Sequence, residues 1–337
     1  MSDVSEQSAA AAATASFDPA SVDDVITALA SHNYIADRGL ATAIFLALKR
    51  HKPLLLQGEP GVGKTEVART LAALLDTRLI RLQCYEGIDQ SSAVYEWNYA
   101  RQLLYIRMLE ADRQVDRAAH GNHGAASGGS ADNATGEARL RDVFGPEFLI
   151  RRPLLEALDA SHERAPVLLI DELDRSDAEF EAYLLELLSD YQITIPEIGP
   201  QRATRPPVVV ITSNRTRDIH DALRRRCLYY WIEYPTLEKE YAIVRTRVPE
   251  ASDLLARQVV TFVQLLRNED FFKAPGVAET LDWLGALTAL GQKELTEGAV
   301  QDTLSALLKY QDDVQKLTYG GLLLKLLDKA RDAVAQG

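Results

Sequence analysis

The octapeptide GEPGVGKT, residues 58–65, restricts the fold of this chain more than any other feature. It satisfies the pattern G-x-x-x-x-G-K-[ST], in which a glycine-rich loop joins a β-strand to an α-helix. The surrounding sequence has this context, because the apolar run PLLLQ at 53–57 precedes the loop and the helical pattern TEVARTLAALL at 65–75 follows it. The chain therefore predicts a phosphate-binding loop at the carboxyl end of a buried strand.

The residue types in this loop match the chemistry of nucleotide phosphates. Consecutive backbone N–H groups, together with the positive end of the following helix dipole, form an anion site, and Gly61 and Gly63 let the backbone come close. Lys64 would reach the β- and γ-phosphates, and Thr65 would ligate the Mg²⁺ that bridges them. The expected ligands are ATP and Mg²⁺. The residues we predict to hold them here are Gly58, Glu59, Pro60, Gly61, Val62, Gly63, Lys64, Thr65 and Glu66.

Three further apolar runs, at 78–84, 166–171 and 207–213, have the length and the flanking signals of buried strands. Helical patterns lie between them, so we expect an α/β fold with a doubly wound parallel sheet. After Pro235 the strand signals disappear and helical periodicity continues, which predicts a small helical domain after the core. The expected organisation is a disordered tail at 1–18, a nucleotide-binding core at 19–235 and a helical domain at 236–337.

Two adjacent acids follow the apolar run PVLLI. A strand at this point would deliver Asp171 and Glu172 to the carboxyl end of the sheet, where ligands bind in α/β folds. Asp171 would hold Mg²⁺ through its hydration shell, and Glu172 would orient and activate the attacking water. Two acids after a strand are also an ordinary signal for a helix N-terminus. The upstream phosphate-binding loop favours the catalytic interpretation.

Polar residues after the fourth predicted strand complete the candidate site. Asn214 ends the run ITSN, where its amide could hydrogen-bond the attacking water or the γ-phosphate, although a turn-forming asparagine is the alternative. Either Arg225 or Arg226, in the cluster ALRRRC, could touch a neighbouring subunit's nucleotide as an arginine finger. A solvated basic turn is the alternative there. The predicted catalytic residues are thus Glu172, Asn214, Arg225 and Arg226.

The segment between Glu172 and Asn214 is predicted to form a helix and a β-hairpin. The stretch SDAEFEAYLLELLSD has one apolar face and predicts a packed helix with a capping box made by Ser176 and Glu179. The sequence after it alternates like a strand, turns near Ile198 and returns, which predicts an extra hairpin before the fourth strand.

A second biased stretch, rich in Gly, Ala, Ser and Asn, predicts a flexible insertion at about 115–138. It contains His120 and His123, which could suggest a metal site. Because no rigid scaffold or further ligand lies near them in the sequence, we favour a solvated loop.

Composition narrows the classes of partner and compartment. The chain has 49 acidic and 37 basic residues, and its net charge of −12 repels a phosphate backbone, although a local basic stripe or a positive ring pore could still bind one. Cys84 and Cys227 form no CxxC pair, which argues against a disulfide framework or a zinc site. The start lacks the parts of a signal peptide and no run of about 18 apolar residues occurs, so we expect a cytoplasmic protein without a membrane span.

Five longer runs extend the short motifs: NYIADRGLATAIFLAL, GEPGVGKTEVA, LIDELDRSDAEFEAYLLELLSDYQITIPEIG, TSNRTRDIHDALRRRCLYYWIEYP and KAPGVAETLDW. Through them, residues from about 30 to 290 resemble the MoxR family of AAA+ ATPases. Within that family they look most like the branch associated with maturation of carbon monoxide dehydrogenase and related molybdenum hydroxylases.

The resemblance implies a P-loop AAA+ αβα core with a helical lid, a homohexameric ring with ATP between subunits, and a partner with a von Willebrand factor A (VWA) domain. It implies a pre-sensor hairpin at 193–205 and places Tyr34 and Ile35 near the adenine. It also implies a role for each motif: Walker A for Lys64 and Thr65, Walker B for Asp171 and Glu172, sensor 1 for Asn214, and the trans-acting finger for Arg225 or Arg226.

The sequence departs from this pattern in the lid. Many relatives carry a sensor-2 arginine where a lid helix opens, but the corresponding stretch APGVAET has no arginine between Lys273 and the next helix. The lid would then sense nucleotide differently, and Lys273 is one candidate for that contact. Before the insertion, Tyr95, Trp97 and Tyr99 either pack in a core or touch a remodelled client, with packing favoured.

Three functions follow from these observations. The leading one is an ATP-hydrolysing chaperone that remodels a metalloenzyme client for cofactor installation. A DNA-acting motor or loader is the second, and stimulation of hydrolysis by DNA would favour it. The third is a nucleotide-gated scaffold with negligible turnover, against which the intact set Lys64, Asp171, Glu172 and Asn214 argues.

Overall fold

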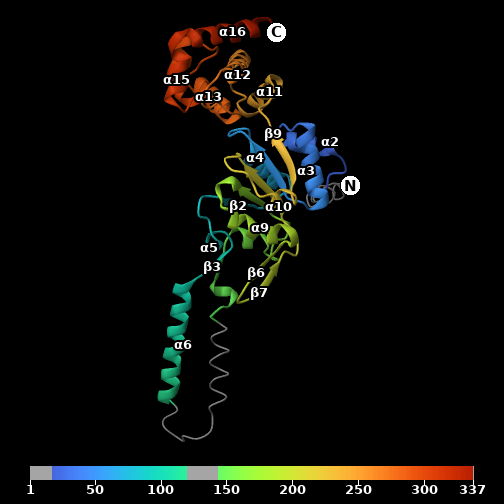
Figure 1. Ribbon diagram of the computed structural model, residues 1–337, viewed down its shortest axis with the longest axis vertical. Helices are drawn as coiled ribbons and strands as arrows, with labels where there is room; N and C mark the ends of the chain where they lie inside the picture. Colours follow the sequence, from blue (N-terminus) through green and yellow to red (C-terminus); the bar gives the residue numbers. More distant parts are fainter. Residues whose placement is uncertain (1–16, 120–142, 337) are drawn as a thin grey trace, which may run out of the picture.

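The computed structural model describes residues 17–119 and 143–336 (Figure 1), and for 112–119 the backbone only. The predicted tail, apart from its last two residues, and most of the predicted insertion, including His120 and His123, lie outside the described residues. None of the described helices is long and apolar enough to cross a membrane.

A five-stranded parallel sheet forms the centre of the molecule, as the α/β pattern predicts. Its strands lie in the order β2-β5-β8-β1-β9. Four of them coincide with the predicted apolar runs, and the fifth, β9, is additional. The strands are β1 (Leu54–Gly58), β2 (Leu79–Gln83), β5 (Val167–Asp171), β8 (Val208–Ser213) and β9 (Leu228–Ile232).

Both faces of this sheet are covered, because alternate residues of each strand point to opposite sides. Leu54 and Leu56 of β1 belong to one hydrophobic cluster, and Leu55 between them belongs to the other. The first cluster is covered by α2 (Val22–Ser31), α3 (Arg38–Arg50) and α4 (Lys64–Leu74). The second is covered by α5 (Gln90–Ala93), α8 (Pro153–Ala157), α9 (Ala178–Asp190) and α10 (Asp221–Arg224).

From α11, which begins at Leu237, onward the chain is helical and has its own hydrophobic cluster, which includes Phe262 and Trp283 with ring centroids 5.5 Å apart. The buried carboxylate of Glu240 accepts two hydrogen bonds from the Arg267 guanidinium, at 2.6 and 2.8 Å, and a third from Thr280 Oγ1 at 2.8 Å. These bonds tie the first three helices together. The elements are α11 (Leu237–Arg247), α12 (Asp253–Arg267), α13 (Val277–Ala289), α14 (Glu297–Leu307), α15 (Gln311–Thr318), η4 (Tyr319–Gly321) and α16 (Leu322–Gln336).

A projection leaves the core between β2 and β5. It consists of β3 (Tyr95–Trp97), the long helix α6 (Tyr99–Ala119), η2 (Pro146–Phe148) and β4 (Leu149–Arg151), and α6 points away from the sheet in Figure 1. Trp97 is buried and stacks edge-to-face on Phe144 at 5.3 Å, so packing explains this aromatic residue. Tyr99, in contrast, is 69% exposed.

The hairpin predicted before the fourth strand is present as β6 (Gln192–Ile195) and β7 (Gly199–Arg202). The predicted capping box of the preceding helix is wrong by one position. The N-cap of α9 is Asp177, whose carboxylate accepts from the Phe180 N–H, whereas Ser176 ends the short helix η3 (Leu173–Arg175) and donates to the Leu173 carbonyl. Aspartate caps a helix at least as well as serine, which is why the helix can begin one residue later.

Candidate nucleotide-binding site

A cavity of about 500 Å³ lies where the carboxyl ends of the strands meet α11 and α13. The core contributes a polar end and the helical region contributes mainly apolar side chains. Most of the predicted binding and catalytic residues line this one cavity. They are Tyr34, Ile35, Pro60, Gly61, Val62, Gly63, Lys64, Thr65, Glu66, Asp171, Glu172 and Asn214.

The glycine-rich loop has the backbone conformation that its glycines permit. Gly61 and Gly63 have φ values of +78° and +96°, a region that L-residues with a Cβ rarely adopt. Gly63 is also the N-cap of α4, so the free N–H groups of the first helical turn face the loop. Gly58 and Glu59 are not part of the cavity lining, but their backbone carbonyls accept hydrogen bonds from Lys64 Nζ at 2.8 and 2.7 Å.

Lys64 is the buried cation of the cavity, with only 7% of its surface exposed. Burial lowers the pKa of its ammonium group to about 8, although the nearby carboxylates of Asp174, Glu59 and Asp171 act in the opposite direction. The ammonium group bonds to two loop carbonyls. A phosphate oxygen at the mouth of the loop would be a stronger partner for it.

Thr65 and Asp171 meet at the polar end of the cavity. Thr65 Oγ1 donates to Asp171 Oδ1 at 3.1 Å, and Thr212 Oγ1 donates to the same oxygen at 2.6 Å. Hydroxyl and carboxylate oxygens side by side are the hard ligands that Mg²⁺ takes together with water and phosphate oxygens. The donor set therefore fits Mg²⁺ at Thr65 and Asp171.

A guanidinium group faces the other oxygen of this carboxylate. Arg81 on β2 donates to Asp171 Oδ2 through Nη2 at 2.6 Å and through Nε at 3.0 Å. Asp171 itself is 3% exposed, so its charge is compensated inside the site.

Glu172 has a left-handed backbone, with φ of +56°, directly after β5. Its N–H donates to Thr212 Oγ1 at 2.9 Å. Its carboxylate accepts from Gln83 Nε2 at 3.0 Å and from Arg175 Nη1 at 3.2 Å. Thr212 therefore fixes the Glu172 backbone, and Gln83 and Arg175 fix the direction of its carboxylate. This carboxylate lines the cavity beside Lys64, where it could accept a proton from an attacking water.

Asn214 follows β8 and is positioned by Asp174. The Asn214 N–H donates to Asp174 Oδ1 at 3.1 Å, and the Thr216 N–H and hydroxyl donate to Oδ2 at 2.9 and 2.6 Å. Burial alone would raise the pKa of Asp174, but these hydrogen bonds outweigh it and hold the pKa below the usual aspartate value. An ionised Asp174 thus orders the turn that carries Asn214.

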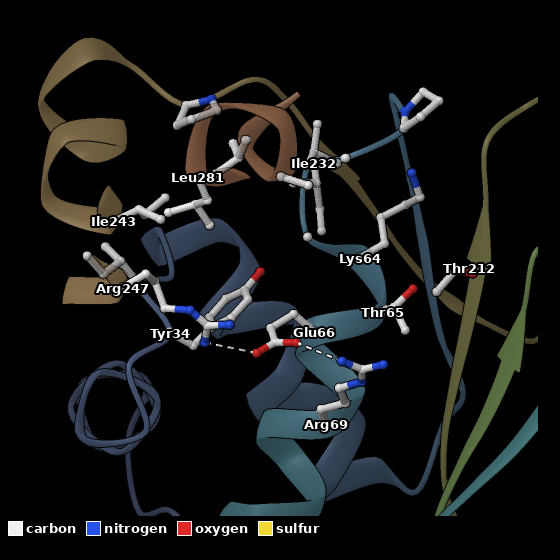
Figure 2. Close-up of a pocket in the computed structure, with 18 of the residues that line it drawn as sticks. Tyr34, Lys64, Thr65, Glu66, Arg69, Thr212, Ile232, Ile243, Arg247 and Leu281 are labelled. Carbon is white, nitrogen blue, oxygen red and sulfur yellow. Dashed lines mark hydrogen bonds and ion pairs between the residues drawn. The ribbon is translucent and has the colours of Figure 1, made fainter. Parts of the chain in front are cut away.

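The opposite end of the cavity is apolar. Tyr34 of the core lies across it from Ile243 of α11 and Leu281 of α13 (Figure 2), and Ile35 also belongs to the lining. The Tyr34 hydroxyl stays protonated, since burial raises its pKa well above the usual tyrosine value. A slot of this size and polarity could accept a flat heteroaromatic base.

Arg225 and Arg226 do not line the cavity. Both are exposed, at and just after the end of α10. Arg226 donates to Ser189 Oγ at 2.7 Å and to the Ala222 carbonyl at 3.1 Å. Among the side chains that the structure describes, at 17–111 and 143–336, none is a hydrogen-bond or ion-pair partner of the Arg225 side chain.

Sequence reasoning did not identify several polar residues of the site: Arg81, Gln83, Thr212, Lys239 and Arg247. A signal existed for the pair on β2, because Arg81 and Gln83 are two residues apart and so share one face of a strand. Lys273, the candidate for a lid contact, is not part of the lining. Its N–H donates to Asp313 Oδ2 at 3.2 Å, and α13 begins with the apolar Val277 and Ala278 at the cavity.

A comparison with known protein families agrees with this geometry. The model of the AAA domain (dynein-related subfamily) matches residues 53–227. No curated protein sequence matches the chain. Among solved structures, the RuvB Holliday junction branch migration motor of Thermotoga maritima is 18% identical over 88% of this chain and 74% of that chain, with a TM-score of 0.42. A mutant form of the same protein is 19% identical over 88% and 74%, with a TM-score of 0.45.

The matched segment runs from the residue before β1 to the end of the arginine cluster after α10, and it contains the loop, the acid pair and Asn214. It spans just over half of the 337 residues. The chain therefore belongs to the AAA domain family, in its dynein-related subfamily.

Proposed function

We propose that the protein is a Mg²⁺-dependent ATPase that converts ATP and water to ADP and phosphate. The observation that carries this proposal is the convergence of Lys64, Thr65, Asp171, Glu172 and Asn214 on one cavity that also has an apolar slot. Three separate segments supply these groups, so their convergence is a property of the fold. A site that only bound nucleotide would not need a positioned carboxylate such as Glu172.

Each residue has one task in this proposal. The loop N–H groups and Lys64 bind the phosphates, and Thr65 and Asp171 hold the metal, which neutralises charge that develops on the phosphate oxygens. Glu172 accepts the proton of the attacking water, and the Asn214 amide orients that water or the γ-phosphate. Tyr34, Ile35, Ile243 and Leu281 enclose the base. Hydrogen bonds from Gln83 and Arg175 direct the Glu172 carboxylate.

We further propose that the protein works as a homohexameric ring. Arg225 and Arg226 are exposed and outside their own cavity, which is the placement that a finger acting on a neighbour's nucleotide requires. Residues 19–235 would form the core of each subunit, and residues 236–337 would form a lid over its nucleotide.

The work done with ATP is, in our proposal, remodelling of a protein client. The exposed apolar side chains of α6, namely Tyr99, Leu103, Leu104 and Met108, support a protein contact, because exposed large apolar groups near one another commonly mark interaction sites. The sequence resemblance suggests the client class, a molybdenum hydroxylase such as carbon monoxide dehydrogenase, and a VWA-domain partner. The net charge of −12 disfavours the alternative of a DNA motor.

Steady-state ATPase measurements with added partners test this assignment. Purified protein and Lys64→Ala are assayed alone, with DNA, with a candidate VWA protein and with an immature molybdenum hydroxylase. We expect a basal rate that Lys64→Ala abolishes and that the VWA protein or the hydroxylase raises. Stimulation by DNA alone would favour the nucleic-acid motor. Absence of turnover under every condition would leave the nucleotide-gated scaffold.

A further inference from the structure

The helical region presents one stripe of α11 to the cavity. Lys239, Ile243 and Arg247 all line it and are spaced four residues apart, so they lie along one face of the helix. Ile243 faces the apolar slot, with a cation one helical turn away on each side. Figure 2 shows Ile243 and Arg247 side by side above Tyr34.

Both cations are held by carboxylates of the core. Lys239 Nζ lies 3.0 Å from Asp37 Oδ2, and Arg247 Nη1 lies 3.1 Å from Glu66 Oε1. Asp37 also accepts from the Tyr230 hydroxyl at 2.5 Å and from the Leu40 N–H at 2.8 Å, so its carboxylate is well satisfied without Lys239. At its two ends, α11 is therefore tied across the cavity by ion pairs.

Glu66 is at a position where a nucleotide would compete for its partner. It directly follows Thr65 and belongs to the first turn of α4, whose N–H groups face the phosphate-binding loop. Its carboxylate lies between two guanidinium groups, with Arg69 Nη1 at 3.7 Å on the side away from Arg247 (Figure 2). A carboxylate beside an anion site repels a bound phosphate unless its own cations compensate it.

The other lid helix at the cavity cannot supply a cation. Ala278 and Leu281 are its lining residues after Val277, and the Ala278 N–H donates to the Gly61 carbonyl at 3.1 Å. Gly276 lies so close to the loop that an added Cβ would be 2.7 Å from the Pro60 carbonyl oxygen. Among the described residues that line the cavity, Lys239 and Arg247 are therefore the only cations that come from the helical region.

We propose that Arg247 is a ligand of the nucleotide phosphates that the lid supplies, and that Glu66 holds it ready in the nucleotide-free protein. On binding, the guanidinium exchanges the Glu66 carboxylate for a phosphate oxygen, and Arg69 remains to neutralise Glu66. Because the Arg247 side chain is 43% exposed, it can make this exchange without unfolding its surroundings. Arginine suits this task, since its fork bonds carboxylate and phosphate in similar geometry. The proposal rests on the nucleotide site proposed above.

A simple latch between lid and core would behave differently from a phosphate ligand. In a latch, loss of either partner opens the lid, so Arg247→Ala and Glu66→Gln weaken nucleotide binding alike. In the exchange proposed here, Arg247→Ala weakens binding, whereas Glu66→Gln releases the arginine and removes a repelling charge, and so tightens it. The two variants then change the nucleotide affinity in opposite directions.

Isothermal titration calorimetry of the full chain with MgADP and with the non-hydrolysable analogue MgAMPPNP measures these changes in nucleotide affinity. We expect Arg247→Ala to weaken both affinities about fivefold to tenfold, Arg247→Lys to weaken them less, and Glu66→Gln to tighten them about twofold or more. In the Arg247→Ala background, Glu66→Gln should increase the nucleotide affinity less than it does in the wild type. A double-mutant cycle quantifies this difference. Arg257→Ala is the matched control, because Arg257 is a lid arginine with a single carboxylate partner, Asp253, and lies outside the cavity lining.

The outcomes separate this inference from the proposed function. If the wild type binds nucleotide and Arg247→Ala binds as tightly as Arg257→Ala, the inference is wrong and the nucleotide site stands. If Arg247→Ala and Glu66→Gln weaken nucleotide binding equally, the proposed exchange of partners is wrong and the ion pair acts as a latch. If the wild type and Lys64→Ala are alike in showing no binding, the nucleotide site and this inference fail together.

Discussion

Arg81 Nη2 lies 2.6 Å from Asp171 Oδ2, across the neighbouring strands β2 and β5. This guanidinium neutralises the carboxylate that we propose as a Mg²⁺ ligand. An incoming Mg²⁺ therefore meets a carboxylate that is already paired, and its binding must offset the weakening of that pair.

Arg81→Ala should lower the Mg²⁺ concentration that gives half-maximal ATPase activity, by about twofold to fivefold, because the unpaired Asp171 attracts the cation more strongly. The measurement is a Mg²⁺ titration at fixed total ATP. Arg78→Ala is the control, since Arg78 pairs with Glu156 at 2.7 Å and is not part of the cavity lining. A higher Mg²⁺ requirement in Arg81→Ala would show that Arg81 assists binding rather than competing with it.

Gly276→Ala should weaken nucleotide binding about tenfold without unfolding the protein. The added Cβ would meet the Pro60 carbonyl oxygen at 2.7 Å and Gly61 Cα at 2.8 Å, which pushes the start of α13 off the loop. Gly285→Ala, on the same helix, is the control, because its added Cβ would meet no atom within 4 Å apart from the backbone of its own helix and its chain neighbours. It should bind normally and be slightly more stable, since alanine favours helix over glycine by about 1 kcal/mol. Equal nucleotide affinities in the two variants would contradict the close packing of the start of α13 against the loop.

Arg225→Ala should reduce ATP turnover about 100-fold or more while leaving nucleotide affinity near that of the wild type, because a finger acts on the transition state in a neighbouring subunit. Arg226→Ala should have a smaller effect, since Arg226 is already bonded to Ser189 and to the Ala222 carbonyl. Turnover and affinity are measured separately, and sedimentation checks that each variant assembles like the wild type. The reverse order of effects would assign the finger to Arg226.

Asp174→Asn should destabilise the protein at pH 7 by about 1–3 kcal/mol, because it removes the charged acceptor for Asn214 and Thr216 inside the fold. The pKa of Asp174 is lowered in the folded state, so its ionised form contributes stability above its unfolded pKa of about 4. That contribution is lost as the pH falls through the lowered folded-state pKa. Urea unfolding of both proteins from pH 7 down to pH 3 should therefore show a difference that narrows below pH 4. A difference that does not change with pH would mean that the charge of Asp174 is not what matters.

The parts of the site that are local in sequence could be predicted from it. The loop and its helix are contiguous, and the acid pair and Asn214 each directly follow an apolar run. Because the strands are parallel, all three sets of residues meet at one edge of the sheet once the order of strands is known. The sequence does not state that order, but any doubly wound arrangement brings carboxyl ends together.

Contacts between distant segments could not be predicted in this way. Arg81 and Gln83 acquire partners only because β2 lies beside β5, and Arg247 meets Glu66 only because α11 packs against the core at the cavity. β9 was missed because its run LYYWI follows a basic cluster and has no apolar alternation, although its aromatic residues favour strands. The pattern of a single sequence predicts whether a segment is a helix or a strand. It does not predict which other segment that helix or strand packs against.

The most direct test of the central claim compares turnover of the wild type with that of Glu172→Gln under saturating MgATP, with nucleotide binding measured in parallel. We expect both proteins to bind ATP and only the wild type to hydrolyse it, with the variant slower by about 100-fold or more because the base that accepts the water proton is gone. Wild-type turnover no faster than that of Glu172→Gln, with binding intact in both, would contradict the account and leave a protein that binds nucleotide without using its energy.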